Sequence, residues 1–283
     1  MAKKMIALDM DGTLFTSTGL ITVENKNAIR EAQKAGHIVI ACSGRPHDVL
    51  LAFLEKERLG DLPVSASNGS ITVVDGEIID RVSMDMKSAA ILFDWLDRHK
   101  YPFKLYTNKG VFQPHEFLTR AEFELTTNEL VEHPHFANFG ILKEHTSKFG
   151  AIGVNSFAEI PNEIEIYKIY IMTPNMEKKA LLEQFAHGVG DLVITSSFAD
   201  NVELSDLNGH KGNGITVVAN HFNIPIEDTI AIGDNLNDAG MMEVAGLAIA
   251  MGNADQEIIA MADIVTLTND EDGVAHAIRK YVL

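Results

Sequence analysis

Short apolar runs that end in polar residues recur in the first part of the chain. Residues 4–8 lead into an Asp-Met-Asp-Gly-Thr segment at 9–13, and residues 37–42 lead into Ser-Gly-Arg-Pro at 43–46. A polar, helix-forming stretch lies between them, with Thr22 as its expected N-cap. Because short apolar runs closed by Gly are typical of buried strands, this order predicts two strands joined by a helix.

The same pattern continues beyond the second run. We predict a helix near residues 46–58, a short strand near 64–67 and a hairpin at 71–79. The hairpin is indicated by Asp75-Gly76 between alternating apolar residues, which is the strongest short-range signal for this motif. The β-α-β-α-β order implies right-handed crossovers and a parallel sheet with helices on both faces.

The middle of the chain has a different pattern, in which pairs of strands alternate with helices. The predicted elements lie at residues 86–99, 103–106, 111–113, 165–172, 175–187, 192–196 and 202–205. This order predicts a separate α+β domain with its own antiparallel sheet. A long polar stretch at 114–148 interrupts it. Because His133, His135 and His145 match no metal-ligand spacing, we interpret this stretch as solvated surface.

The last part of the chain returns to strict alternation of helix and strand. The predicted elements lie at residues 211–222, 229–234, 239–245, 247–251, 254–261, 263–266 and 272–282. The simplest assembly is an α/β protein in which both chain ends, residues 1–83 and 208–283, build one parallel sheet. Residues 84–207 would then be inserted as the α+β domain, with short hinges near 81–84 and 207–210.

Composition and charge narrow the classes of function. The formal net charge of −17 argues against a nucleic-acid-binding surface, which needs a basic patch, although a metal ion can still create a local site for an anion. No apolar run approaches the ~20 residues of a membrane span. We expect no signal peptide, because the N-terminal lysines lead directly into a strand. The single cysteine, Cys42, fits a reducing cytosol, so we expect a cytoplasmic protein.

Two acids, Asp9 and Asp11, follow the first apolar run. Side chains two residues apart in an extended chain point the same way, and ligands bind at the carboxyl ends of parallel strands. Two neighbouring carboxylates are costly unless a cation or a proton is shared between them. Taken alone, the pair is equally compatible with a turn after a strand.

Three further groups lie at expected strand ends or at a helix start: Ser43 with Gly44 and Arg45, Lys211, and Gly-Asp-Asn-Leu-Asn-Asp at 233–238. Together they could perform phosphoryl transfer. A carboxylate can attack phosphorus, and Mg²⁺ held by Asp9 and Asp234 can reduce the charge repulsion. Asp11 can protonate the leaving group, while Ser43 and Lys211 can bind phosphate oxygens.

These residues resemble the four motifs of the haloacid dehalogenase (HAD) superfamily of phosphatases, which occur here in the family's order and spacing: residues 9–14, Ser43, Lys211 and residues 233–238. Two further segments are similar to its Cof-type branch: residues 230–238, and Ser43-Gly44-Arg45-Pro46 with Asn68-Gly69. The resemblance implies a Rossmann-like catalytic core and a C2-type substrate-specificity cap at residues 84–207.

The resemblance also implies Mg²⁺ as cofactor and a role for each matching residue. Asp9 would be the nucleophile that forms a phosphoaspartate. Asp11 would be the general acid and base, with its backbone carbonyl on Mg²⁺, and Asp9 and Asp234 would be the other Mg²⁺ ligands. The implied phosphate site comprises Ser43, Gly44, Lys211 and Asn237. Thr13 and Asp238 would support these groups, with Asn237 and Asp238 orienting water ligands or Lys211.

Three residues have open roles. Arg45 could contact substrate or pair with an acid near the site. Asn68 could line the site, but a turn needs the same residue type. His210 stands where a small or hydroxyl residue is expected before Lys211, and it could contact substrate or lie at the surface.

We therefore expect a Mg²⁺-dependent phosphatase that hydrolyses small phosphorylated metabolites, such as sugar phosphates or phosphorylated cofactors. Two alternatives are a phosphomutase with the same nucleophile and, from another class, a phospho-ligand binding protein without activity. The presence of every motif residue argues against the second alternative. The sequence identifies neither the substrate nor the oligomeric state.

Overall fold

The computed structural model describes residues 3–127, 150–198 and 200–283. It divides into two compact units, the first formed by Met1–Val82 with Asn208–Leu283 and the second by Ser83–Leu207. Within the polar stretch, His133, His135 and His145 lie outside the described residues. Among the described residues, no helix combines the length and apolar character needed to span a membrane.

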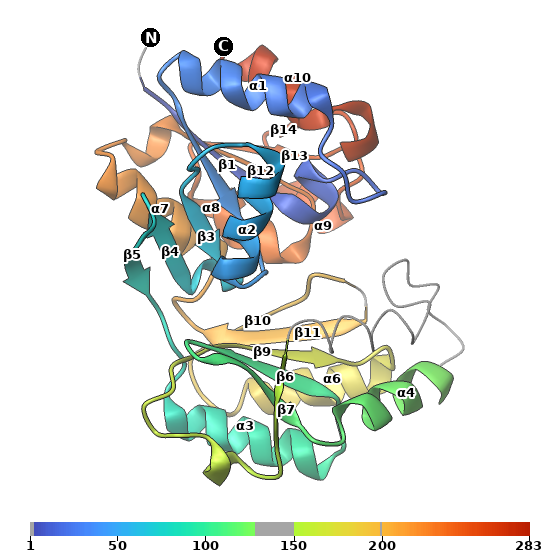
Figure 1. Cartoon of the computed structure of the whole chain (residues 1–283). Helices are drawn as coiled ribbons and strands as arrows, with labels where there is room; N and C mark the ends of the chain where they lie inside the picture. The colour runs from blue at the N-terminus through green and yellow to red at the C-terminus, as the bar shows by residue number, and fades with distance from the viewer. Residues whose placement is uncertain (1–2, 128–149, 199) are drawn as a thin grey trace. The chain divides into compact units, whose positions relative to one another are not determined.

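The first unit is built on one sheet, in which the described strands follow the order β14-β13-β12-β1-β2-β3-β4-β5 (Figure 1). Its parallel strands are β1 (Met5–Asp9), β2 (Ile38–Cys42), β3 (Val64–Ala66), β12 (Thr229–Gly233), β13 (Leu247–Ala250) and β14 (Ile264–Val265). The two antiparallel strands are β4 (Ile71–Val74) and β5 (Glu77–Arg81). Because β1 pairs with both β2 and β12, the prediction of a parallel sheet built by both chain ends is confirmed.

The helices of the first unit alternate with these strands along the chain, as the sequence predicts. They are α1 (Val23–Lys34), α2 (His47–Glu57), α7 (Lys211–His221), α8 (Ala239–Val244), α9 (Gln256–Met261) and α10 (Gly273–Tyr281). Thr22 caps α1 by accepting a hydrogen bond from the backbone N–H of Asn25. Helices α1 and α10 lie side by side, so the two ends of the chain also pack together outside the sheet (Figure 1).

The second unit is an α+β unit with a sheet of its own. Its described strands follow the order β10-β11-β9-β6-β7-β8, and all neighbours are antiparallel except β7 and β8. These strands are β6 (Phe103–Thr107), β7 (Gly110–Pro114), β8 (Ile152–Val154), β9 (Ile166–Met172), β10 (Leu192–Thr195) and β11 (Asn201–Asp206). Its helices are α3 (Met86–Arg98), α4 (Phe117–Thr127) and α6 (Met176–Ala186).

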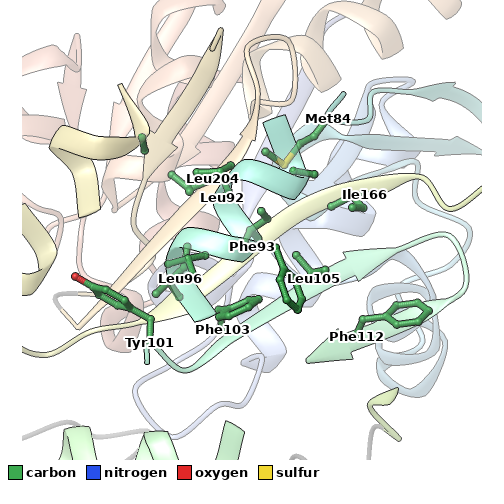
Figure 2. Close-up of a cluster of buried hydrophobic side chains, with 14 of the residues drawn as sticks. Met84, Leu92, Phe93, Leu96, Tyr101, Phe103, Leu105, Phe112, Ile166 and Leu204 are labelled. Atoms are coloured by element: carbon green, nitrogen blue, oxygen red, sulfur yellow. The ribbon is translucent and has the colours of Figure 1, made fainter. Parts of the chain in front are cut away.

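A single apolar cluster joins α3 to this sheet (Figure 2). The buried residues of α3 include Leu92, Phe93 and Leu96, whose spacing gives one apolar helix face. Phe93 meets Phe103 of β6 edge to face, with ring centroids 5.0 Å apart. Alternate residues of β6 therefore point into this cluster, and the residues between them lie on the other face of the sheet.

Helix α4 and strand β8 are missing from the sequence-based prediction, which has no elements between residues 114 and 164. The buried positions of α4 have helical spacing, but two of them are charged, Arg120 and Glu124. Arg120 is paired with Asp97 and Glu116, and Glu124 with Lys178. Because hydrophobic periodicity is the main signal for a helix, buried charges that are neutralised by partners conceal it.

Candidate active site

The turn after β1 holds two acids and is shaped by Gly12. Asp9 is the last residue of β1, and Gly12 has a φ of +87°. A Cβ at this position would lie 2.2 Å from Oδ2 of Asp234, so only glycine allows the two segments to approach this closely. The Thr13 hydroxyl donates a hydrogen bond of 2.8 Å to Oδ1 of Asp234. The turn and the end of β12 are thus held together, as the parallel pairing of β1 with β12 requires.

Asp238 organises the segment that follows β12. Its Oδ2 accepts hydrogen bonds from the backbone N–H groups of Asp234, at 2.8 Å, and Asn235, at 3.0 Å. Its Oδ1 lies 2.5 Å from Nζ of Lys211. Both carboxylate oxygens of Asp238 are therefore engaged, and this residue is fully buried. Asp238 thus holds Lys211 and the backbone after β12, and the role expected for it in the reaction stays a prediction.

Lys211 begins α7 and connects this segment to β1. Its Nζ lies 2.5 Å from Oδ1 of Asp9, and its side chain is fully buried. Burial lowers the pKa of the ammonium group, but Asp238 and Asp9 outweigh this effect, so the pKa of Lys211 lies above its usual range. The start of α7 reaches this position through a close approach of Gly69, where a Cβ would lie 2.1 Å from the backbone oxygen of His210.

Three carboxylates surround this lysine. Ligand oxygens of Asp9, Asp234 and Asp238 lie within 4.8 Å of one another, and all three residues are buried. Burial, and then the negative charge of Asp238, raise the pKa of Asp9 to about 7. Burial and the charge of Asp9 raise the pKa of Asp234 well above its usual range. The cluster therefore has an excess of negative charge, which a cation would relieve.

A hard divalent cation fits this cluster. The carboxylate oxygens of Asp9 and Asp234 are available as metal ligands, because those of Asp238 accept hydrogen bonds from Lys211 and from the backbone. Oxygen ligands suit Mg²⁺. The absence of a Cβ at Gly12 lets the Asp234 carboxylate lie against the turn after β1. The side chain of Asp11 is not part of the cluster, but the ligand expected from this residue is its backbone carbonyl.

Asp11 is instead held by Arg45. Nε of Arg45 lies 2.9 Å from Oδ2 of Asp11 and Nη2 lies 2.6 Å from Oδ1, which forms a two-pronged ion pair. Of the two roles open for Arg45 at the level of sequence, the structure contains the pairing with an acid. A contact with substrate stays a prediction.

The loop after β2 and the turn after β3 meet at the same edge of the sheet. The hydroxyl of the buried Ser43 accepts a hydrogen bond of 3.2 Å from the backbone N–H of Arg45, and Gly44 lies between these two residues. The backbone N–H of Asn68 donates to the carbonyl of Ser43, at 3.0 Å. Nδ2 of Asn237 donates to Oδ1 of Asn68, at 3.4 Å. Ser43 and Asn237, two of the predicted phosphate-binding residues, are thus linked through Asn68.

His210 has a structural environment of its own. Its Nδ1 is buried and has no hydrogen-bond partner in the described part of the chain. Cβ atoms at Gly240 and Gly212 would lie 2.7 Å and 3.0 Å from this nitrogen. Burial lowers the pKa of His210. The ring therefore covers the place where the two glycines let α7 and α8 approach, and a contact with substrate stays a prediction.

Two asparagines that the sequence analysis did not identify hold the turn after β1. Nδ2 of Asn253 donates to the carbonyl of Gly12, and Nδ2 of Asn269 donates to the carbonyl of Phe15, both at 2.8 Å. The two asparagines are joined by a hydrogen bond of 2.9 Å from the backbone of Asn269 to Oδ1 of Asn253. Their one sequence signal is that they follow the strands predicted at 247–251 and 263–266.

Comparisons with known proteins agree with this geometry. Residues 6–278 match the family model described as haloacid dehalogenase-like hydrolase. The phosphatase YwpJ of Bacillus subtilis is 34% identical in an alignment of 284 positions, which covers 98% of this chain and 99% of that protein. The 5-amino-6-(5-phospho-D-ribitylamino)uracil phosphatase YwtE of the same organism is 32% identical, over 97% of this chain and 96% of that protein.

The fold agrees as well. A solved structure described as a haloacid dehalogenase-like hydrolase from B. subtilis superposes with a TM-score of 0.83 at 34% identity, over 99% of this chain and 100% of that chain. The chain therefore belongs to the haloacid dehalogenase-like hydrolases, as a phosphatase of their Cof-type branch.

Proposed function

We propose that this protein is a Mg²⁺-dependent phosphatase that hydrolyses small phosphorylated metabolites through a phosphoaspartate on Asp9. The observation that carries this proposal is the buried cluster in which Asp9 lies beside Lys211 and within reach of Asp234. A carboxylate at a strand end with an ammonium group beside it suits a nucleophile that must approach an anionic phosphoryl group.

The reaction would proceed in two half-reactions. In the first, an oxygen of Asp9 bonds to phosphorus, the bond from phosphorus to the substrate oxygen breaks, and Asp11 gives its proton to that oxygen. In the second, Asp11 takes a proton from water, the water oxygen bonds to phosphorus, and the bond from phosphorus to Asp9 breaks. Inorganic phosphate leaves, and both acids return to their starting protonation states.

The other residues would bind and orient the phosphoryl group. Lys211 has three N–H donors, and those that bond to Asp9 and Asp238 leave one for a phosphate oxygen. Ser43 accepts a hydrogen bond from the backbone of Arg45, so its own O–H is oriented by that contact and can donate to phosphate. Carboxylates of Asp9 and Asp234 and the carbonyl of Asp11 would hold Mg²⁺, which would neutralise charge on the phosphoryl oxygens.

Relatives, rather than the site, support the substrate class that we propose. YwtE is named for a phosphorylated ribitylaminouracil, a small metabolite with a phosphorylated sugar-alcohol chain. We extend this class to the present chain, as sugar phosphates or phosphorylated cofactors. We further propose that the second unit, residues 84–207, serves as the cap that selects among such substrates.

Asp9→Asn tests the nucleophile. This variant should lose turnover of p-nitrophenyl phosphate by at least about 10³-fold and should bind no radiolabel when mixed with labelled substrate and quenched in acid. The matched control is Asp61→Asn, at an exposed acid before β3, which should retain both signals. Near-ultraviolet circular dichroism checks that both variants fold. Turnover in Asp9→Asn would contradict the proposal.

Product analysis separates the phosphatase from the phosphomutase. A hexose phosphate is incubated with the enzyme, with and without a hexose bisphosphate. Release of inorganic phosphate in both reactions is expected. An isomeric hexose phosphate that forms only with the bisphosphate would instead indicate a mutase.

A further inference from the structure

We propose that Arg45 is a positioning residue that acts on the reaction through Asp11 and not through a contact with substrate. The inference rests on the proposed function, in which Asp11 exchanges a proton with the leaving group and with water. Nε and Nη2 of Arg45 each donate to a different oxygen of Asp11, at 2.9 Å and 2.6 Å. Such a fork fixes both the direction and the rotation of the carboxylate, which a single hydrogen bond does not.

Arg45 is itself held in place. Its backbone N–H donates to the hydroxyl of Ser43, and its carbonyl accepts from the backbone N–H of Ser67, at 2.9 Å. The guanidinium carbon lies 5.2 Å from the centroid of the Phe15 ring, within the range of a cation–π contact. Phe15 in turn meets Phe53 of α2 edge to face, at 4.7 Å. An arginine fixed at its backbone and at its tip can orient its partner.

Asp11 can still take up a proton within this ion pair. Each carboxylate oxygen has about two lone-pair sites, and the fork occupies one on each oxygen. The side chain of Asp11 is 33% exposed, so a substrate oxygen or a water molecule can reach it. The fork uses two of the five N–H donors of Arg45, so the experiment must separate an effect through Asp11 from a contact with substrate.

This arrangement predicts that the importance of Arg45 depends on the leaving group. An alkoxide is a strong base and needs a proton from a well-placed acid as it leaves. A nitrophenolate is a weak base and leaves with little help. Loss of Arg45 should therefore slow the release of an alkyl alcohol much more than the release of p-nitrophenol.

The test compares single-turnover release of the alcohol from glycerol 2-phosphate and from p-nitrophenyl phosphate. The variants are Arg45→Met, Asp11→Asn and the double variant. The matched control is Arg279→Met, since Arg279 forms an equally forked pair with Glu31 on α1. Thermal unfolding checks the fold, and Arg45→Met should unfold near the wild-type temperature because the pair is partly exposed.

Arg45→Met should slow release from glycerol 2-phosphate by about 10²-fold, as expected for a misplaced catalytic group. Release of p-nitrophenol should change by less than about threefold, and KM should stay the same for both substrates. In the Asp11→Asn background, Arg45→Met should have no further effect on release from glycerol 2-phosphate, because the group that it positions is already gone. Arg279→Met should match the wild type.

Three results would overturn the inference: equal slowing with both substrates, losses that multiply in the double variant, or a raised KM with unchanged kcat. If the proposed function itself is wrong, the result is different. Asp9→Asn would then retain turnover, whether or not Arg45→Met slows the release of the alcohol.

Discussion

Both units contain a buried lysine paired with a carboxylate, but the charges around the two lysines differ. Lys211 of the first unit bonds to Asp9 and Asp238, and Asp234 lies in the same cluster. Lys211 thus bonds to two buried carboxylates, and the third lies beside those two. Burial first, and then the neighbouring carboxylates, raise the pKa values of Asp9 and Asp234.

In the second unit, Lys168 of β9 is paired with Glu203 of β11 at 3.0 Å, and each side chain is 4% exposed. Lys168 also lies 5.1 Å from the centroid of the Tyr106 ring. A buried pair of this kind adds little net stability and by itself indicates no chemistry. Burial of charge therefore does not distinguish the candidate active site from the second unit, because both contain it. The candidate active site differs because its buried carboxylates outnumber the lysine that they accompany.

The largest expected difference between the two units is in turnover after both charges of the lysine–carboxylate pair are replaced. Lys211→Met with Asp238→Asn should lower turnover of p-nitrophenyl phosphate by at least about 10³-fold, because phosphate loses its cationic partner. Lys168→Met with Glu203→Gln should change this turnover by less than about threefold and unfolding by less than about 2 kcal/mol, because neutral replacement of a whole buried pair is close to neutral. Steady-state kinetics and urea unfolding measure both. Equal losses of activity would remove the distinction between the two lysines.

Two glycines with similar backbone angles sharpen the comparison. Gly12 and Gly110 have φ values of +87° and +103°, so alanine is strained at both, at a cost of about 1–2 kcal/mol. Only at Gly12 would the added methyl meet a neighbour, Oδ2 of Asp234; at Gly110 nothing lies within 4 Å. Gly12→Ala should therefore lower kcat by about 10²-fold, and Gly110→Ala should leave kcat near the wild-type value. Loss of kcat in both variants would show that backbone strain alone is responsible.

The smallest expected effect is on stability in the presence of Mg²⁺. A cation that binds beside Asp9 and Asp234 should stabilise the folded first unit by about 2.7 kcal/mol at a concentration of 100 times Kd. The measurement is the unfolding temperature of the protein with Mg²⁺ and with a chelator, which requires no turnover.

Asp234→Asn supplies the control for this effect. The variant should be more stable than the wild type in chelator, since one buried like charge is removed, and it should gain much less from Mg²⁺. An equal gain in both proteins would place the stabilising cation elsewhere.

Most of the architecture could be predicted because its signals are local. Apolar runs closed by Gly marked the strands of the first unit, and Asp75-Gly76, with φ values of +51° and +78°, formed the expected turn. The signal failed in α4, where Arg120 and Glu124 take buried positions and find partners from other segments. Such partners are not visible in a local pattern, so the helix was missed.

The sequence by itself determined which residues gather at one edge of the sheet. Asp9 and Asp234 end strands of the same direction, and Lys211 begins a helix that follows the return of the chain to this sheet. Parallel strands bring their carboxyl ends to one edge whatever the distance between them along the chain. Order and spacing of residues were therefore sufficient for this conclusion.

Only the tertiary structure decided how these residues share their hydrogen bonds. Arg45 donates hydrogen bonds to Asp11. Asp238 accepts from Lys211 with one oxygen and from the backbone with the other. Asn253 and Asn269 donate to carbonyl groups of the turn after β1. These hydrogen bonds depend on differences of about an ångström between segments that are far apart in sequence. Gly12 and Gly69 allow the close approach of two segments because they have no Cβ. Spacing along the chain contains no measure of such distances, because packing alone sets them.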